Sequence, residues 1–160
     1  MKKVTVLSVC LVLVLCISFT TSAIASDEDD VLAIASNFAK AQTNNDNELM
    51  ASLWWNSPKT STFGPPSGLA FLTQGYDAIM EWMKSTADMP AGTYVRTVHN
   101  PQVTMLGNNV AVLTTYSVFT QNPPAVEETV YSQERMTFVV QKINGKWLIV
   151  HGHGSAFPVE

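Results

Sequence analysis

Two histidines near the C-terminus have the spacing of a metal-binding pair. His151 and His153 are separated by one residue in an apolar segment, so in a strand both imidazoles lie on one face. Metal sites use such pairs, but a zinc site needs at least one further protein ligand. One other histidine, His99, is available, and both cysteines, Cys10 and Cys16, fall in a segment that we expect to be removed. We therefore predict no metal site and no cofactor.

Glu134 is the carboxylate best suited to acid–base chemistry. It shares an alternating segment with Met136 and Phe138, and apolar neighbours raise the pKa of a carboxyl group toward that of a general base. A second interpretation is an exposed glutamate that pairs with the adjacent Arg135, because most glutamates are solvated. The sequence favours the second interpretation. If the protein is an enzyme, Glu134 is its expected base.

The C-terminal half that carries these residues has the pattern of antiparallel strands. Asn144-Gly145 is the preferred pair for a type I′ hairpin turn, since both residues tolerate positive φ. Period-two alternation predicts strands over residues 93–99, 103–106, 110–120, 130–143 and 146–157. In the last of these strands, the same period places Trp147 and Ile149 on the face that carries the two histidines.

The N-terminal half has the pattern of helices. Ser26, followed by four acidic residues, is a helix start, and apolar residues then recur with a helical period to about Thr43. A second short helix is predicted over 48–55 and a third over 76–87, with a short strand at 60–63 between them. Helices followed by a run of antiparallel strands indicate an α+β domain.

Residues 1–25 have the pattern of a secretory signal peptide. A short basic start precedes an apolar stretch, and Ala23-Ile24-Ala25 is a small-x-small cleavage site, which places the mature start at Ser26. An uncleaved membrane anchor is the alternative, but the stretch is short for a spanning helix. We therefore predict a periplasmic or secreted protein in which residues 26–160 form one domain.

The composition of the predicted mature chain excludes several partners and sites. Removal of Lys2 and Lys3 from the nine basic residues leaves seven against thirteen acidic residues, a net charge of −6. This balance argues against nucleic acid and against an anionic membrane surface as partners. Because both cysteines precede Ser26, disulfides, thiol nucleophiles and thiolate metal sites are excluded from the mature chain.

The segment Gly145–Ser155, GKWLIVHGHGS, resembles the end of the nuclear-transport-factor-2-like superfamily. The resemblance is to its SnoaL-like polyketide-cyclase group and to the association domain of calcium/calmodulin-dependent protein kinase II. It extends to Asn100-Pro101 with Val103, and to Gly75-Tyr76-Asp77 at the start of the third helix. It implies three N-terminal helices packed in a strongly curved antiparallel sheet, which forms a cone with an internal pocket. It does not imply a reaction.

When the sequence is laid on these relatives, it lacks the catalytic residues of one group and the ligand-binding arginines of another. The tyrosine and aspartate positions of ketosteroid isomerases fall on Phe38 and Gly64, which can neither donate a proton nor abstract one. The arginine positions with which the association domain binds small carboxylates fall on Val118, Phe138 and Gly154. The same resemblance implies a concave face that carries Thr104, Tyr116, Val118, Glu134, Phe138 and Gly154.

The preferred hypothesis of function is an exported domain that binds a small apolar or amphipathic molecule and has no recoverable catalytic constellation. Of the adjacent Trp54 and Trp55, one is expected in the core and one over the cavity. The predicted ligand-binding residues are Trp55, Thr104, Tyr116, Glu134, Phe138 and His153. The first alternative is a proton-transfer enzyme (isomerase, dehydratase or cyclase) with Glu134 as base and Tyr116 or a pocket histidine as hydrogen-bond donor.

The second alternative is an assembly module that forms a homodimer through the outer face of the sheet, as the superfamily usually does. The residues expected on that face are Arg135, Thr137, Trp147, Ile149, His151 and His153. Such a face is too apolar to remain exposed, which favours burial against a second copy. A competing arrangement turns Arg135 and both histidines toward the pocket.

Overall fold

The structure of the protein, a computed structural model, describes residues 27–64, 71–84 and 89–157. The helices span 27–43, Asn47–Leu53 (α2) and Tyr76–Lys84 (α3). The strands are β1 (Ser61–Gly64), β2 (Phe71–Gln74), β3 (Tyr94–Met105), β4 (Val110–Gln121), β5 (Val130–Ile143) and β6 (Lys146–Ala156). The predicted signal peptide and the end of the helix predicted over 76–87 lie outside the described residues.

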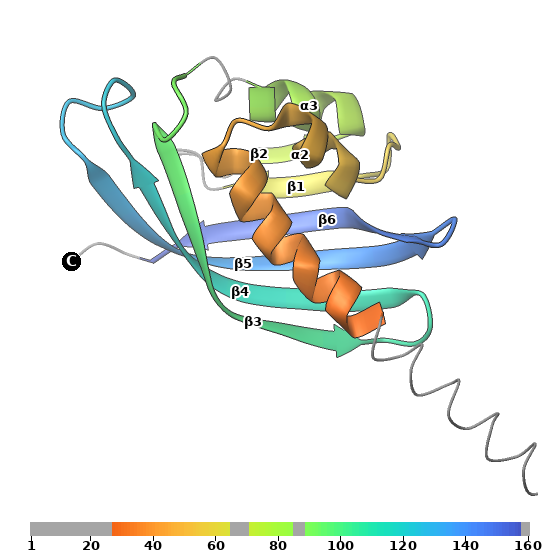
Figure 1. The fold of residues 1–160 in the computed structure, drawn as a ribbon. Helices are drawn as coiled ribbons and strands as arrows, with labels where there is room; N and C mark the ends of the chain where they lie inside the picture. The colour runs from red at the N-terminus through yellow and green to blue at the C-terminus, as the bar shows by residue number, and fades with distance from the viewer. Residues whose placement is uncertain (1–26, 65–70, 85–88, 158–160) are drawn as a thin grey trace, which may run out of the picture.

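One six-stranded sheet, in the order β2-β1-β6-β5-β4-β3, carries the helices on one of its faces (Figure 1). Neighbouring strands are antiparallel except β1 and β6, which pair in parallel with Ser61 opposite His151. The first helix crosses the long strands, while α2 and α3 lie over the end formed by β1 and β2 (Figure 1). The predicted α+β class and the helices-on-sheet architecture are confirmed. The sheet is not closed.

Strict alternation divides the long strands into two faces, which we call the inner face, toward the helices, and the outer face, away from them. In β4, Leu113, Thr115 and Ser117 are buried, whereas Thr114 and Tyr116 between them are exposed. Apolar side chains of the first helix, including Phe38, pack on the inner face. Its ring lies 5.2 Å from that of Phe138, centroid to centroid.

A β-bulge in β6 reverses the alternation of that strand, so odd-numbered residues before the bulge and after it point to opposite faces of the sheet. Val140 pairs with Ile149, but the adjacent Val139 pairs with His151, so Val150 is an extra residue. Consequently Trp147 and Ile149 point inward and are buried in the core. His151 and His153 lie on the outer face, opposite β5 residues on that face. The prediction that all four side chains share the outer face is therefore wrong, because one inserted residue reverses the period of two.

A second bulge bends β3. The register shifts between His99 and Gln102, and Asn100 there has a φ of 49°. The two strands predicted over 93–99 and 103–106 are thus one bent strand. The predicted Asn144-Gly145 hairpin turn is confirmed, since both residues have positive φ, 51° and 82°.

Asp27 fixes the start of the first helix to the β5–β6 hairpin next to its turn. Its carboxylate accepts hydrogen bonds from Lys142 Nζ at 2.5 Å and from Trp147 Nε1 at 3.1 Å. These two hydrogen bonds, with Lys142 the larger cause, hold the pKa of Asp27 below its usual value. Within the described ranges, no helix is long and apolar enough to cross a bilayer.

Candidate functional site

A small cavity lies between the helices and the inner face, at the end where β1 and β6 meet α3. It is lined by Phe38, Gln42, Trp54, Thr62, Phe63, Gly64, Trp82, Met83, Arg96, Glu134, Met136, Phe138, His153 and Gly154. Its volume is about 40 Å³, close to the volume of one water molecule. The side chains that line it therefore nearly fill it.

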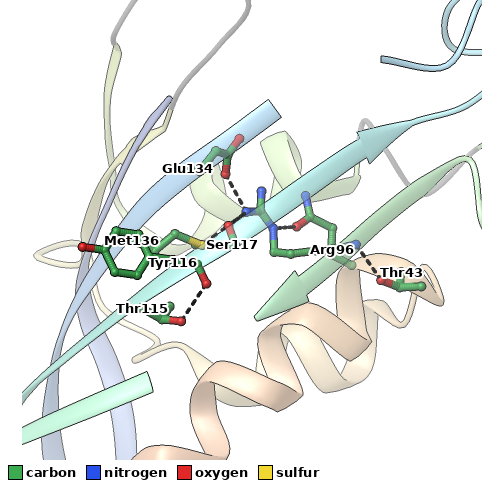
Figure 2. A network of polar contacts seen from close by, with 8 residues as sticks. Thr43, Arg96, Thr115, Tyr116, Ser117, Glu134 and Met136 are labelled. Carbon is green, nitrogen blue, oxygen red and sulfur yellow. Dashed lines mark hydrogen bonds and ion pairs between the residues drawn. The ribbon is translucent and has the colours of Figure 1, made fainter. Parts of the chain in front are cut away.

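Arg96 and Glu134 form a buried ion pair in the cavity lining (Figure 2). Arg96 Nη1 donates to Glu134 Oε2 at 2.5 Å and to Ser117 Oγ at 2.6 Å, and Nε donates to Gln42 Oε1 at 2.6 Å. The guanidinium carbon also lies 4.7 Å from the centre of the Phe119 ring. Arg96 and Glu134 are only 8% and 3% exposed, so each charge depends on its partner rather than on water.

The register of three strands brings this network together. Ser117 in β4 is directly opposite Glu134 in β5, and Arg96 in β3 is opposite Phe119 in β4. All four side chains project inward from the sheet. The first helix supplies Gln42, and the adjacent Thr43 accepts a hydrogen bond from the backbone N–H of Arg96 at 3.0 Å. The network therefore fixes the end of the first helix over β3.

Trp54 contributes a buried hydrogen-bond donor that has no acceptor in the described part of the chain. The residue itself is buried, and its indole lies against Gly152. A Cβ atom on Gly152 would be 2.9 Å from Trp54 Cη2, so glycine is needed there. Trp54, and not the predicted Trp55, lines the cavity. Trp55 instead donates its backbone N–H to the carbonyl of Ile149 at 2.9 Å.

The structure places the predicted site residues on both sides of the sheet. Glu134 and Phe138 border the cavity from the inner face, whereas His153 borders it from β6 although its side chain lies on the outer face, against the Phe63 ring. Thr104 and Tyr116, expected on the concave face, are exposed on the outer face, and Tyr116 is 54% exposed. The inward neighbours of Tyr116 are Thr115 and Ser117, so laying the chain on its relatives gave β4 the wrong parity.

The expected partner of Glu134 also differs. Arg135 is exposed on the outer face, with its guanidinium carbon 4.4 Å from the centre of the Phe157 ring. Successive residues in a strand point to opposite faces, so the two neighbours cannot pair across the sheet. The prediction of an exposed Glu134 paired with Arg135 is therefore wrong. The actual partner, Arg96, and the network residues Gln42 and Ser117 were not predicted.

His151 and His153 both pack against the Phe63 ring on the outer face. The ring centroids are 5.9 Å and 6.0 Å from that of Phe63, and both contacts are edge-to-face. His151 Nδ1 is 2.8 Å from Ser61 Oγ. Burial, and secondarily the charge of His153, lowers the pKa of His151 below its usual value. Among the described residues no three side chains of the histidine, cysteine, aspartate or glutamate type gather at one point.

Comparison with known proteins identifies the family. A family model described as a SnoaL-like domain matches residues 31–160, so the chain belongs to the SnoaL-like domain family. No significant match is found among curated proteins.

Solved structures of the nuclear-transport-factor-2-like superfamily share the fold. A protein of this superfamily from Salmonella enterica serovar Typhimurium is 22% identical, with a TM-score of 0.67 over 88% of this chain and 94% of that one. The association domain of C. elegans CaMKII is 21% identical, with a TM-score of 0.66 over 82% and 96%. A scytalone dehydratase-like protein from Novosphingobium aromaticivorans is 12% identical, with a TM-score of 0.74 over 86% and 89%. At these identities the likeness concerns the fold.

Proposed function

We propose that this chain is a non-catalytic domain that binds a small, largely apolar molecule without net charge in the cavity beside Arg96 and Glu134. The observation that carries the proposal is the buried ion pair in the cavity lining. Because the two fixed charges cancel, a charged ligand would add an uncompensated charge to a buried site, which costs several kcal/mol by the order of magnitude for ions in protein interiors. A neutral ligand avoids this cost.

The hydrogen-bonding groups that remain open favour a ligand with an acceptor atom. Trp54 Nε1 is a buried donor without an acceptor among the described residues. A carbonyl or ether oxygen between apolar groups would satisfy this donor, and a buried donor gains most from such a partner. A neutral carbonyl compound is therefore the ligand class we propose.

Room for this ligand requires a side chain to move, and we expect Trp82 on α3, which lines the cavity, to do so. Its indole covers Gly64 so closely that a Cβ atom there would be 2.9 Å from Trp82 Cη2. Trp82 is also 39% exposed, so its indole borders the solvent as well as the cavity of about 40 Å³. Met83 and Met136 line the same cavity, and methionine adapts readily to a new neighbour. We expect the ligand to enter by displacing the Trp82 indole.

The enzyme alternative, with Glu134 as general base, has less support. Glu134 Oε2 already accepts a hydrogen bond from Arg96 Nη1, so the carboxylate is engaged by the ion pair rather than directed at a ligand. Tyr116, the proposed second group, lies on the opposite face of the sheet. The substitution Glu134→Gln tests this alternative when assayed at a temperature at which the variant remains folded, because loss of a general base lowers the rate by about two to four orders of magnitude.

Export is the second part of the proposal. It rests on the basic start, the apolar stretch and the Ala23-Ile24-Ala25 site, all outside the described residues. We expect exported protein to begin at Ser26 and to contain no thiol. Measurement of its intact mass tests this, and a mass that retains Cys16 or carries an attached lipid would contradict it.

Self-association through the outer face is a second candidate function. The observation that favours it is a group of exposed aromatic side chains on that face, namely Tyr116, Phe157 and Phe63. Trp147 and Ile149 are not available for such an interface, because they are buried within the single chain. We expect sedimentation to show a homodimer that the variant Phe63→Asp dissociates. A monomeric unmodified protein at micromolar concentration would contradict this candidate.

Native mass spectrometry of protein purified from its own exported fraction tests the ligand proposal. We expect a bound compound without net charge, which denaturation releases. The variant Trp54→Phe keeps an aromatic ring but removes the N–H donor, and should weaken binding of that compound about tenfold. The matched control is Trp55→Phe, outside the cavity lining. An anionic bound compound, or equal effects of the two variants, would contradict the proposal.

A further inference from the structure

A second hollow lies on the outer face of the sheet, on the side opposite the cavity. It is a groove of about 520 Å³ over β3, β4 and β5. It begins at the β3 bulge, where Asn100 has positive φ and the register with β4 shifts. Its main polar side chains are Asn100, Gln102, Thr114, Tyr116, Arg135 and Thr137. This groove is more than ten times as large as the cavity of about 40 Å³.

Arg135 is the charged residue of the groove and has no carboxylate partner among the described residues. Its guanidinium lies over the face of the Phe157 ring, with 4.4 Å from the guanidinium carbon to the ring centre. Phe157 in turn stacks on Tyr116, with 6.3 Å between ring centroids and 24° between planes. Stacking orients a guanidinium while its N–H donors remain free in the plane, ready for a bidentate acceptor.

The outer face is poor in negative charge although the chain as a whole is acidic. Its ionisable side chains include Arg135, His99, His151 and His153. The described acidic residues lie instead in the helices, at their caps or in the β4–β5 loop, except Glu134. Glu134 borders a neighbouring hollow of about 260 Å³, but its charge is balanced by Arg96. A negative ligand would therefore meet a favourable potential at this groove.

The remaining polar groups indicate what else such a ligand must carry. Amides of Asn100 and Gln102 and hydroxyls of Thr114, Thr137 and Tyr116 offer both donors and acceptors, and no hydrogen bond between them and other described side chains occupies these groups. Alternating donors and acceptors fit hydroxyl groups, which both donate and accept. Tyr116, 54% exposed, also offers part of an aromatic ring to an apolar ring surface.

We propose that the outer-face groove binds a small carboxylate rich in hydroxyl groups, of the sugar-acid class, with the carboxylate on Arg135 and the hydroxyls on the amide and threonine side chains. This site is distinct from the cavity and goes beyond its proposed ligand. A second copy of the chain would bring the same cation-bearing face to the groove, whereas a carboxylate supplies the missing negative charge. The charge pattern thus favours the small acid over self-association at this position.

Titration of the exported protein with sodium glucuronate, followed by amide chemical shifts, tests the proposal. We expect the largest shifts in residues that line the groove, and weaker binding of glucose, which has similar hydroxyls but no carboxylate. The variant Arg135→Gln should weaken glucuronate binding at least about tenfold, since a charge-assisted hydrogen-bonded pair is lost. The matched control is Lys146→Gln, which removes one exposed positive charge at the start of β6, beside the Asn144-Gly145 turn.

Three results would overturn the proposal. The first is equal binding of glucose and glucuronate. The second is a loss of binding in Lys146→Gln as large as that in Arg135→Gln. Either result would mean that the carboxylate makes no specific contact with Arg135. A dimer that covers Asn100 and Tyr116 and shows no response to glucuronate would assign the groove to a second copy. None of these results bears on the cavity ligand, because Arg135 and Trp54 lie on opposite faces of the sheet.

Discussion

Each face of the sheet carries an arginine, and the two arginines have opposite environments. On the inner face, Arg96 is 8% exposed and is held by Glu134, Ser117 and Gln42. On the outer face, Arg135 rests on an aromatic ring and has no acidic partner among the described residues. The first arrangement satisfies its charge internally and helps to hold the helices on the sheet. The second leaves its charge for something outside the chain.

This difference indicates that the inner face contributes to the stability of the fold, whereas the outer face is available for binding. Breaking a buried pair leaves an uncompensated charge in the protein interior, whereas removing an exposed charge changes stability little. A substitution on the inner face should therefore reduce stability, and the equivalent substitution on the outer face should affect binding. The predictions below test that division, from the largest expected effect to the smallest.

The largest effect is expected for Glu134→Gln. It leaves the Arg96 guanidinium buried without its counter-charge, which costs about 3–5 kcal/mol and lowers Tm by roughly 10–15 °C. Thermal and urea unfolding measure this loss, and the matched control is Glu128→Gln in the exposed β4–β5 loop. The double variant Arg96→Met, Glu134→Leu should recover most of the stability, because it removes both charges. Equal stability of Glu134→Gln and the control would show that the pair is not desolvated.

The next effect is expected for Ile149→Ala, which tests the inward orientation of the first half of β6. Ile149 is 0% exposed, and its truncation creates a cavity that costs about 2–5 kcal/mol. Val139→Ala, on the outer face of the neighbouring strand, should cost less, because Val139 is partly exposed. Urea unfolding compares the two. Dissociation of a dimer by Ile149→Ala, without loss of monomer stability, would restore the outer-face assignment.

The sequence predicts well what short-range chemistry determines. The Asn144-Gly145 turn follows from two residues that tolerate positive φ, and the helical start at residue 27 follows from the acidic run there. The sequence alone does not reveal the bulge at Val150, because an inserted residue leaves the apolar composition of the strand unchanged while it reverses the faces. Trp147 and Ile149 were misassigned for this reason.

The candidate site was predicted less completely because its pairs are distant in sequence. Arg96 meets Glu134 across 38 positions and Gln42 across 54. The inward alternation of Tyr94, Arg96 and Val98 was the available signal, since an arginine among inward positions requires an acidic partner. The sequence indicates Glu134, but it predicts as the partner the nearest basic residue along the chain, Arg135. Adjacency in a strand places two side chains on opposite faces.

A smaller effect is expected from Asp27, which fixes the first helix over the inner face. Its lowered pKa means that the folded chain holds the proton less tightly than the unfolded chain. The stability it contributes is therefore present above the unfolded pKa, about 3.9, and is lost as the pH falls through the lower folded pKa. Asp27→Asn should be less stable than wild type at pH 7, and the difference should shrink below pH 4 or so. Asp29→Asn, an exposed neighbour, is the control for urea unfolding.

The smallest effect concerns His151 on the outer face. Burial, and then the charge of His153, lowers its pKa, and the groups that face it are Ser61, the Phe63 ring and His153. An unfolded histidine takes up a proton near pH 6.5, so the unfolded chain binds more protons between that pH and the folded pKa. The stability of the fold is then fully retained above about pH 6.5 and declines as the pH falls through this window.

The variant His151→Gln should remove this part of the pH dependence, whereas His99→Gln should not, since His99 is exposed on β3 and contacts Thr97. Urea unfolding on both sides of the window measures the difference, and the ring resonances of His151 report its pKa directly. A pKa at or above the unfolded value would show that the Ser61–Phe63 environment does not desolvate the ring.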